Sequence, residues 1–131
     1  MLKTNSKQAR ENIRAYIVDK FTPDGYIDTP PTEFPEICRF ILDTFQDEKY
    51  YSREAAQKLH ISDQEIFHDW AAGLPGVLDT CYYYNRSAVD DLAVILDETP
   101  AEAARYTETQ AENMLTNLIY RELVNGAKNE L

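Results

Sequence analysis

The stretch Phe67-His68-Asp69-Trp70-Ala71-Ala72-Gly73-Leu74-Pro75-Gly76 decides the fold, because it holds the only tryptophan and two of the chain's four glycines. Phe67 and Trp70 are three residues apart and therefore share one face of a helix. Gly73 adopts the left-handed conformation easily and Pro75 cannot continue a helix, so both predict that the helix ends here. We therefore expect Trp70, Gly73 and Pro75 to form a structural anchor against which the other helices pack. The other interpretation is an indole that serves as a platform for a ligand or partner.

The length and composition are those of one folded domain. The chain has 131 residues, 44% of them hydrophobic, and its nine tyrosines also disfavour disorder. No apolar run approaches the roughly 18 residues that a membrane span needs, and the N-terminus lacks the apolar segment of a signal peptide. We therefore expect a cytoplasmic protein whose two cysteines, Cys38 and Cys81, are reduced thiols, with Cys38 as a small core residue.

The net charge of −10 is distributed unevenly along the chain. Residues 1–21 carry five bases and two acids, whereas residues 22–131 carry 8 bases and 21 acids. Such an acidic body repels a phosphate backbone and attracts a basic partner, although acidic surfaces also serve solubility alone. Nucleic acid is therefore not an expected partner.

Hydrophobic residues at helical spacing predict helices on both sides of the tryptophan stretch. The expected helices span about 6–20, 33–47, 52–60, 63–72, 87–98 and 107–126, with a helical turn at 99–102. Thr32, Ser52, Ser62, Ser87 and Thr107 are the predicted N-caps, and Gly126 is the predicted end of the last helix. The aromatic run 77–84 favours an extended connector or half of a small two-stranded element. The predicted fold is mainly α: a compact bundle of five to six helices in a single domain over residues 1–131, with or without that β element.

Four bases near the N-terminus follow helical steps. Lys3, Lys7, Arg10 and Arg14 are spaced by four, three and four residues, which places them in one stripe if the helix includes Lys3. The stripe predicts either a solvated face that neutralises the protein's own acids or a short basic handle for nucleic acid or an acidic partner.

The segment from Arg53 to Ser62 resembles the first helix and turn of many bacterial repressors. The small contact residue and the packing apolar residues of a helix-turn-helix match four positions, Ala56, Leu59, Ile61 and Ile66. This pattern predicts two tightly joined helices, about 52–60 and 63–72, with or without a role in DNA binding.

The same segment departs from the repressor pattern. His60 stands where glycine is usual, and Asp69 stands where an apolar residue should follow. The second helix also carries Asp63 and Glu65 but no Lys or Arg, so nothing on it would neutralise phosphates.

Metal binding and catalysis find little support in the sequence. His60, His68, Cys38 and Cys81 match the composition of a two-Cys, two-His zinc site but not its spacing. His68 and Asp69 are adjacent on a helix and are expected to point apart. No phosphate loop, nucleophile elbow or paired metal motif is present, so we expect no catalytic residue, no metal and no cofactor. An enzyme would need polar groups clustered around His60 or His68.

The run Tyr82-Tyr83-Tyr84 with Arg86 is a candidate recognition patch, because tyrosine and arginine are enriched at interface hot spots. The simpler interpretation is alternate burial along an extended segment. Lys7, Arg10 and Arg14 are the other candidate interaction residues.

The order of parts resembles a group of small uncharacterised acidic proteins carried by plasmids, conjugative elements and phages of gut bacteria. The resemblance covers most of the chain and depends chiefly on Trp70, Gly73, Leu74 and Pro75, a Trp-x-x-Gly-Leu-Pro motif. An N-terminal helix of the type Ser-Lys-Gln-Ala-Arg-Glu-Asn-Ile-Arg-Ala-Tyr-Ile, an Asp-Gly-Tyr turn and a last helix opened by Thr107 also belong to it. The resemblance implies an accessory protein of a mobile element and brings no known activity or catalytic residues.

Together these patterns favour a non-enzymatic protein-interaction module. Its acidic surface would act on a basic or nucleic-acid-binding host protein, for instance by occupying that protein's binding groove as a mimic of phosphate charge. A partner encoded by the mobile element itself is the other expectation, and no membrane contact is expected. The alternative function is a helix-turn-helix DNA-binding regulator that acts as a dimer. The oligomeric state does not follow from the sequence.

Overall fold

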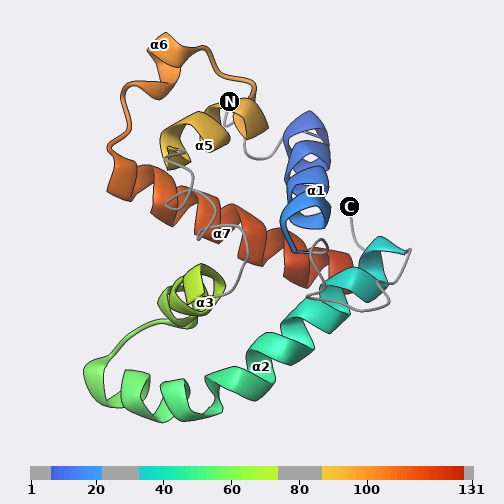
Figure 1. The fold of residues 1–131 in the computed structure, drawn as a ribbon, viewed down its shortest axis with the longest axis vertical. Coiled ribbons are helices and arrows are strands. Elements are labelled where there is room, and N and C mark those ends of the chain that lie inside the picture. The colour runs from blue at the N-terminus through green and yellow to red at the C-terminus, as the bar shows by residue number, and fades with distance from the viewer. Residues whose placement is uncertain (1–6, 22–32, 74–86, 129–131) are drawn as a thin grey trace.

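The structure, a computed structural model, describes residues 7–21, 33–73 and 87–128, all of which belong to helices or to the turns that join them (Figure 1). Its helices are α1 Lys7–Phe21, α2 Phe34–Leu59, α3 Asp63–Gly73, α5 Ala88–Leu96, α6 Pro100–Ala103 and α7 Glu108–Ala127. The mainly α prediction is confirmed, and the described ranges contain no strand. The run 77–84, for which an extended conformation was expected, lies outside the described residues.

Helix α7 is the centre of the arrangement. In Figure 1 it crosses the middle of the molecule, with α1, α5 and α6 on one side and α2 and α3 on the other. Its buried face carries apolar side chains at helical spacing, namely Ala111, Leu115, Leu118, Ile119 and Leu123. Because α1, α2, α3 and α5 all pack on α7, burial of their apolar faces joins them into one hydrophobic core.

The predicted N-caps of the C-terminal half are confirmed. Ser87 accepts a hydrogen bond from the Val89 amide at the start of α5, at 3.1 Å. Thr107 opens α7 with a reciprocal capping box, in which Thr107 and Gln110 each accept a backbone amide of the other. The helical turn expected at 99–102 is α6, whose N-cap is Thr99.

Helix α2 differs from the prediction of two helices. It is one continuous helix of 26 residues, so the expected break between 47 and 52 and the expected N-cap at Ser52 are wrong. The physical reason is that this part of the chain has neither glycine nor proline, and serine is tolerated inside a helix. Burial of Phe45 before this region and Ala56 after it keeps both ends of the helix on the core.

Trp70 packs at the junction of α1, α2 and α3. Its ring lies 5.3 Å from Phe45, 5.6 Å from Phe67 and 6.4 Å from Phe21, measured between centroids. The indole is partly buried, and its Nε1 donates a hydrogen bond of 2.6 Å to Glu48. Phe67, rather than Trp70, takes the fully buried position of α3.

The last residue of α3 is Gly73, and Pro75 lies beyond the described residues. Gly126 was expected to end the last helix, but it lies inside α7, which continues to Ala127. A Cβ at position 126 would come within 2.5 Å of the Cys38 sulfur and 2.6 Å of the Phe34 ring. Glycine is therefore required by the close approach of α2 to α7, and not by a helix end.

Candidate interaction surface

A tight turn of three residues, His60 to Ser62, joins α2 to α3. His60 closes α2 in the left-handed conformation, with φ of 59°, and its backbone amide bonds the carbonyls of Ala56 and Gln57. Ser62 then accepts the Glu65 amide at 3.3 Å, as its predicted role at the start of α3 requires. The chain thus turns sharply between Leu59 and Asp63, and His60 adopts the conformation that glycine usually supplies in such turns.

Only half of the apolar helix-turn-helix positions face the core. Ala56 and Ile66 are buried, whereas Leu59 is 69% exposed and Ile61 is 36% exposed. The two exposed side chains stand at the outer end of the turn, where no described element covers them. We call the surface around Leu59, Ile61 and Asp69 the α2–α3 corner. It includes two depressions, which are described next.

The first depression is an apolar groove between α2 and α3, with a volume of about 400 Å³. Six of its eight lining residues are apolar and two are acidic; they are Glu48, Ala55, Ala56, Leu59, Ile61, Ile66, Asp69 and Trp70. The Trp70–Glu48 hydrogen bond lies in this groove and ties α3 to the middle of α2. The groove is therefore held open by two packed helices and not by a loop.

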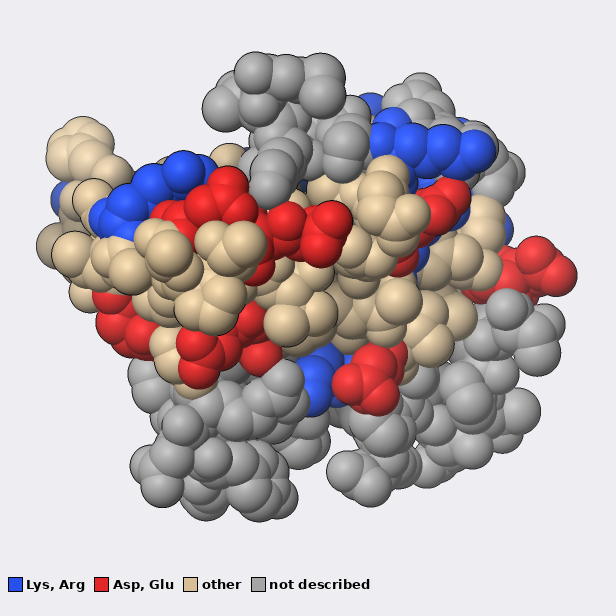
Figure 2. Space-filling model, turned by 90° about the horizontal axis from the view of Figure 1, so that it is seen from above, with Lys and Arg blue, Asp and Glu red and all other residues tan. Residues whose placement is uncertain are grey.

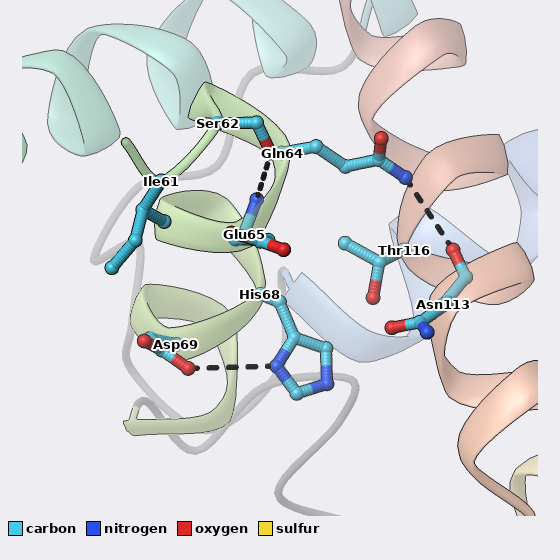
Figure 3. A pocket seen from close by; sticks show the side chains of 8 residues that line it. All are labelled: Ile61, Ser62, Gln64, Glu65, His68, Asp69, Asn113 and Thr116. Carbon is cyan, nitrogen blue, oxygen red and sulfur yellow. Dashed lines mark hydrogen bonds and ion pairs between the residues drawn. The ribbon is translucent and has the colours of Figure 1, made fainter. Parts of the chain in front are cut away.

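The second depression is a polar hollow of about 500 Å³ between α3 and α7 (Figure 3). All but one of its lining residues are polar; they are Ile61, Ser62, Gln64, Glu65, His68, Asp69, Asn113 and Thr116. Gln64 reaches across the hollow toward the Asn113 carbonyl at 3.5 Å. Ile61 and Asp69 line both depressions, so the groove and the hollow form one continuous surface.

His68 sits on the floor of the polar hollow. Its Nδ1 lies 3.6 Å from Asp69, and its buried Nε2 has no hydrogen-bond partner and lies 4.0 Å from Glu112. The expectation that His68 and Asp69 point apart is therefore wrong, because the two side chains are in ion-pair contact and both line the hollow (Figure 3). Polar groups do cluster around His68, and the hydroxyl of Thr116 donates to the Glu112 carbonyl at 2.8 Å. His60 is exposed and lines neither depression.

The α2–α3 corner is negatively charged. Asp63, Glu65 and Asp69 are all exposed on α3, and no lysine or arginine lines either depression. Arg53 and Lys58 are exposed on the neighbouring part of α2. The exposed apolar side chains of Leu59 and Ile61 therefore have acidic neighbours on the α3 side.

Two basic residues of α1, Arg10 and Arg14, have an internal role. Arg14 donates to Glu122 at 2.8 Å and Arg10 donates to the other carboxylate oxygen at 3.2 Å. The Glu122 side chain is only 2% exposed, and the arginines are about three-quarters buried. Of the described bases in the predicted stripe, Lys7 alone is exposed, and Lys3 lies outside the described residues.

The remaining candidate residues from the sequence, Tyr82, Tyr83, Tyr84 and Arg86, fall within 74–86, outside what the structure describes, as does Cys81. Cys38 is a fully buried core residue, as expected, and its burial raises the pKa of the thiol to about 12.

Within the described ranges, no three His, Cys, Asp or Glu side chains are placed to hold a metal ion. None of the helices in those ranges has the length and apolarity that crossing a bilayer demands.

Among the coloured, described residues of the face shown in Figure 2, which is the top of Figure 1, charge is not gathered into one ridge. Acidic side chains form several separate groups there, and basic side chains lie beside some of them.

The chain matches no protein-family model, and no curated protein or solved structure is significantly similar to it. A function therefore has to be inferred from the geometry of the described residues.

Proposed function

We propose that this protein is a non-enzymatic interaction module of a mobile genetic element and that it binds a basic partner protein through the α2–α3 corner. The observation that supports the proposal most is the exposure of Leu59 and Ile61 beside three exposed acids of α3. Exposed apolar side chains at the mouth of a groove are typical of binding surfaces, and a polar rim surrounds the apolar centre of most interfaces.

The negative charge of the corner favours a partner surface of positive charge. Asp63, Glu65 and Asp69 would attract a basic surface over a distance of about one Debye length and would repel phosphate groups. An apolar side chain of the partner fits the groove between Leu59 and Trp70, whereas its polar donors fit the hollow around His68. The groove supplies binding energy and the acids supply orientation and a fast encounter.

Site-specific photo-crosslinking in the native host tests the proposal. A photoreactive amino acid replaces Leu59, and a control protein carries the same group at the exposed position Glu11 of α1. We expect a basic protein to crosslink at position 59 and not at position 11. The crosslink should weaken when Glu65→Gln and Asp69→Asn are combined.

The purified partner then allows a quantitative measurement. Leu59→Ser should raise Kd by about tenfold or more, as truncation of an apolar anchor does at other interfaces. Lys7→Ala, far from the corner, should leave Kd unchanged. Identical crosslinks at positions 59 and 11, or a Kd that Leu59→Ser does not change, would refute the proposal.

A helix-turn-helix DNA-binding regulator is the second candidate, favoured by the tight turn at His60. Against it stand the acids of α3, which would face the phosphates. Gel shifts on DNA next to the gene, at low salt, separate the two functions. Arg53→Ala and Lys58→Ala are suitable controls, because both side chains are exposed on α2, whereas Arg10 and Arg14 hold a buried carboxylate. A specific shift that Lys58→Ala weakens would favour the DNA binder.

The assignment to a mobile element is supported by the Trp-x-x-Gly-Leu-Pro motif at Trp70 and by the other resembling segments. It predicts that the gene lies among plasmid, conjugation or phage genes. A chromosomal position among housekeeping genes in several genomes would contradict it.

A further inference from the structure

A third depression, of mixed character, lies between α5 and α6. In Figure 1 these two helices lie across α7 from α2 and α3. The volume of the depression is about 650 Å³, and it contains no lysine or arginine among its lining residues. Six of its lining residues are apolar and three are acidic; they are Val89, Asp90, Ala93, Val94, Asp97, Glu98, Pro100, Ala103 and Ala104. We call this depression the α5–α6 groove.

Val94 is the most exposed large apolar side chain of the described residues, at 77%. It stands in the α5–α6 groove with Asp90 one helical turn before it and Asp97 three residues after it. An apolar side chain between two carboxylates suits the stem of a lysine or arginine, which is apolar along its length and charged at its end.

The position of the acids is unfavourable for the isolated helix. The C-terminus of a helix carries partial negative charge, which favours bases there. Helix α5 has no base in its last turn and is followed directly by Asp97 and Glu98. A cation from outside the chain would therefore be stabilised by both the carboxylates and the helix end.

The negative charge at the end of α5 is incompletely satisfied within the chain, as the Glu98 carboxylate shows. Its side chain is 2% exposed, and its Oε1 accepts from Arg105 at 3.2 Å and from the Tyr106 hydroxyl at 3.3 Å. Its Oε2 is buried and has no hydrogen-bond partner. A buried charged oxygen without a donor is unfavourable. Because Oε2 is too deeply buried to be reached from the groove, it would act on a cation there through its charge and not through a hydrogen bond.

We propose that the α5–α6 groove binds a lysine or arginine side chain, together with a neighbouring apolar residue, of a segment of a partner protein. The apolar part lies on Val94 and Ala93, and the cationic end lies toward Asp97 and Glu98. Nucleic acids, anionic membranes and a second copy of this chain, with its net charge of −10, are repelled by the same acids. The site is separate from the α2–α3 corner and does not depend on the function proposed for that surface.

Titration of the full-length protein with synthetic peptides, followed residue by residue by amide NMR, tests this inference. The probe is a short peptide of alternating leucine and lysine blocks, and the control peptides carry glutamate in place of lysine or serine in place of leucine. We expect saturable shifts confined to α5 and α6 with the leucine–lysine peptide alone. Because the attraction is electrostatic, the affinity should fall as the salt concentration rises.

Five variants decide where the peptide binds. Val94→Ser and Asp97→Asn change exposed side chains, and asparagine keeps the left-handed conformation of residue 97, so both should fold normally. Each should weaken binding by about fivefold, as should Glu98→Gln, whereas Asp43→Asn on α2 should not. Equal weakening by Asp43→Asn, or shifts spread over the whole acidic surface, would overturn the proposal. Loss of binding in Leu59→Ser would also overturn it, and would assign the peptide to the α2–α3 corner instead.

Discussion

Glu122 of α7 and Arg14 of α1 form a buried ion pair, with the arginine Nε 2.8 Å from the carboxylate. Arg10 bonds the second carboxylate oxygen, and the Arg14 guanidinium also lies 4.4 Å from the centroid of the Phe34 ring. Arg14 of α1 thus contacts both the Glu122 carboxylate of α7 and the Phe34 ring of α2. Breaking a buried pair costs much more than an exposed one, because the remaining charge is left without a partner.

Glu122→Ala should therefore lower the free energy of unfolding by about 3–5 kcal/mol. Urea denaturation followed by circular dichroism measures the change, and Asp43→Ala, at an exposed position on α2, is the matched control. A loss for Glu122→Ala as small as that of the control would mean that the carboxylate is not buried between the arginines.

The Cys38 thiol should be unreactive in the folded protein. Desolvation by burial raises the pKa of Cys38 from 9.0 to about 12, so the reactive thiolate is nearly absent at pH 8. In a Cys81→Ser background, a thiol-alkylating reagent should label the folded protein far more slowly than the protein in urea. Fast labelling without denaturant would contradict the burial of Cys38.

The raised pKa of Cys38 also makes the stability of the folded protein vary with pH in the alkaline range. A pKa raised by folding means that the folded state keeps its proton while the unfolded state loses one, so stability is fully present below pH 9 and is lost as the pH rises toward 12. Cys38→Ala should remove this contribution, and its unfolding free energy should fall less steeply above pH 9 than that of the parent protein. Parallel curves for the two proteins would argue against the shift.

Gly126→Ala should destabilise the protein although alanine is the better helix former. The added methyl group would meet the Cys38 sulfur and the Phe34 ring, and such overpacking costs about 1–3 kcal/mol. Cys38→Ala removes one of the two clashing groups, so the double variant should lose less stability than the sum of the single variants. Additive losses would show that the two positions do not touch.

His60→Gly should stabilise the protein by about 0.5 kcal/mol, since glycine avoids the cost that a side chain pays at φ of 59°. His60→Ala, which keeps a Cβ, should give no such gain. Thermal unfolding of the two variants measures the difference, and a lower melting temperature for His60→Gly than for His60→Ala would refute the turn geometry.

Several local features follow directly from neighbouring residues. The helices that begin after Ser87 and Thr107 were predicted correctly, because a cap depends on residues only two or three positions away. The apolar stripes of α1 and α7 also follow from helical spacing alone, and Cys38 was correctly assigned to the core. Around Ser52 the chain has neither glycine nor proline, and Phe45 and Ala56 on either side are buried, so α2 continues as one helix and the predicted break was wrong.

The residue patterns of this chain were sufficient to determine that it is helical, that it is acidic and that α3 ends near Gly73. Charge is read directly from composition, and helical spacing and chain breakers act over a few residues. Tertiary packing alone decided that Arg10 and Arg14 turn inward to Glu122, that Gly126 faces Cys38, and that Leu59 and Val94 remain uncovered. The reason is physical: a side chain is buried or exposed according to what packs against it, and those neighbours come from parts of the chain far away in sequence.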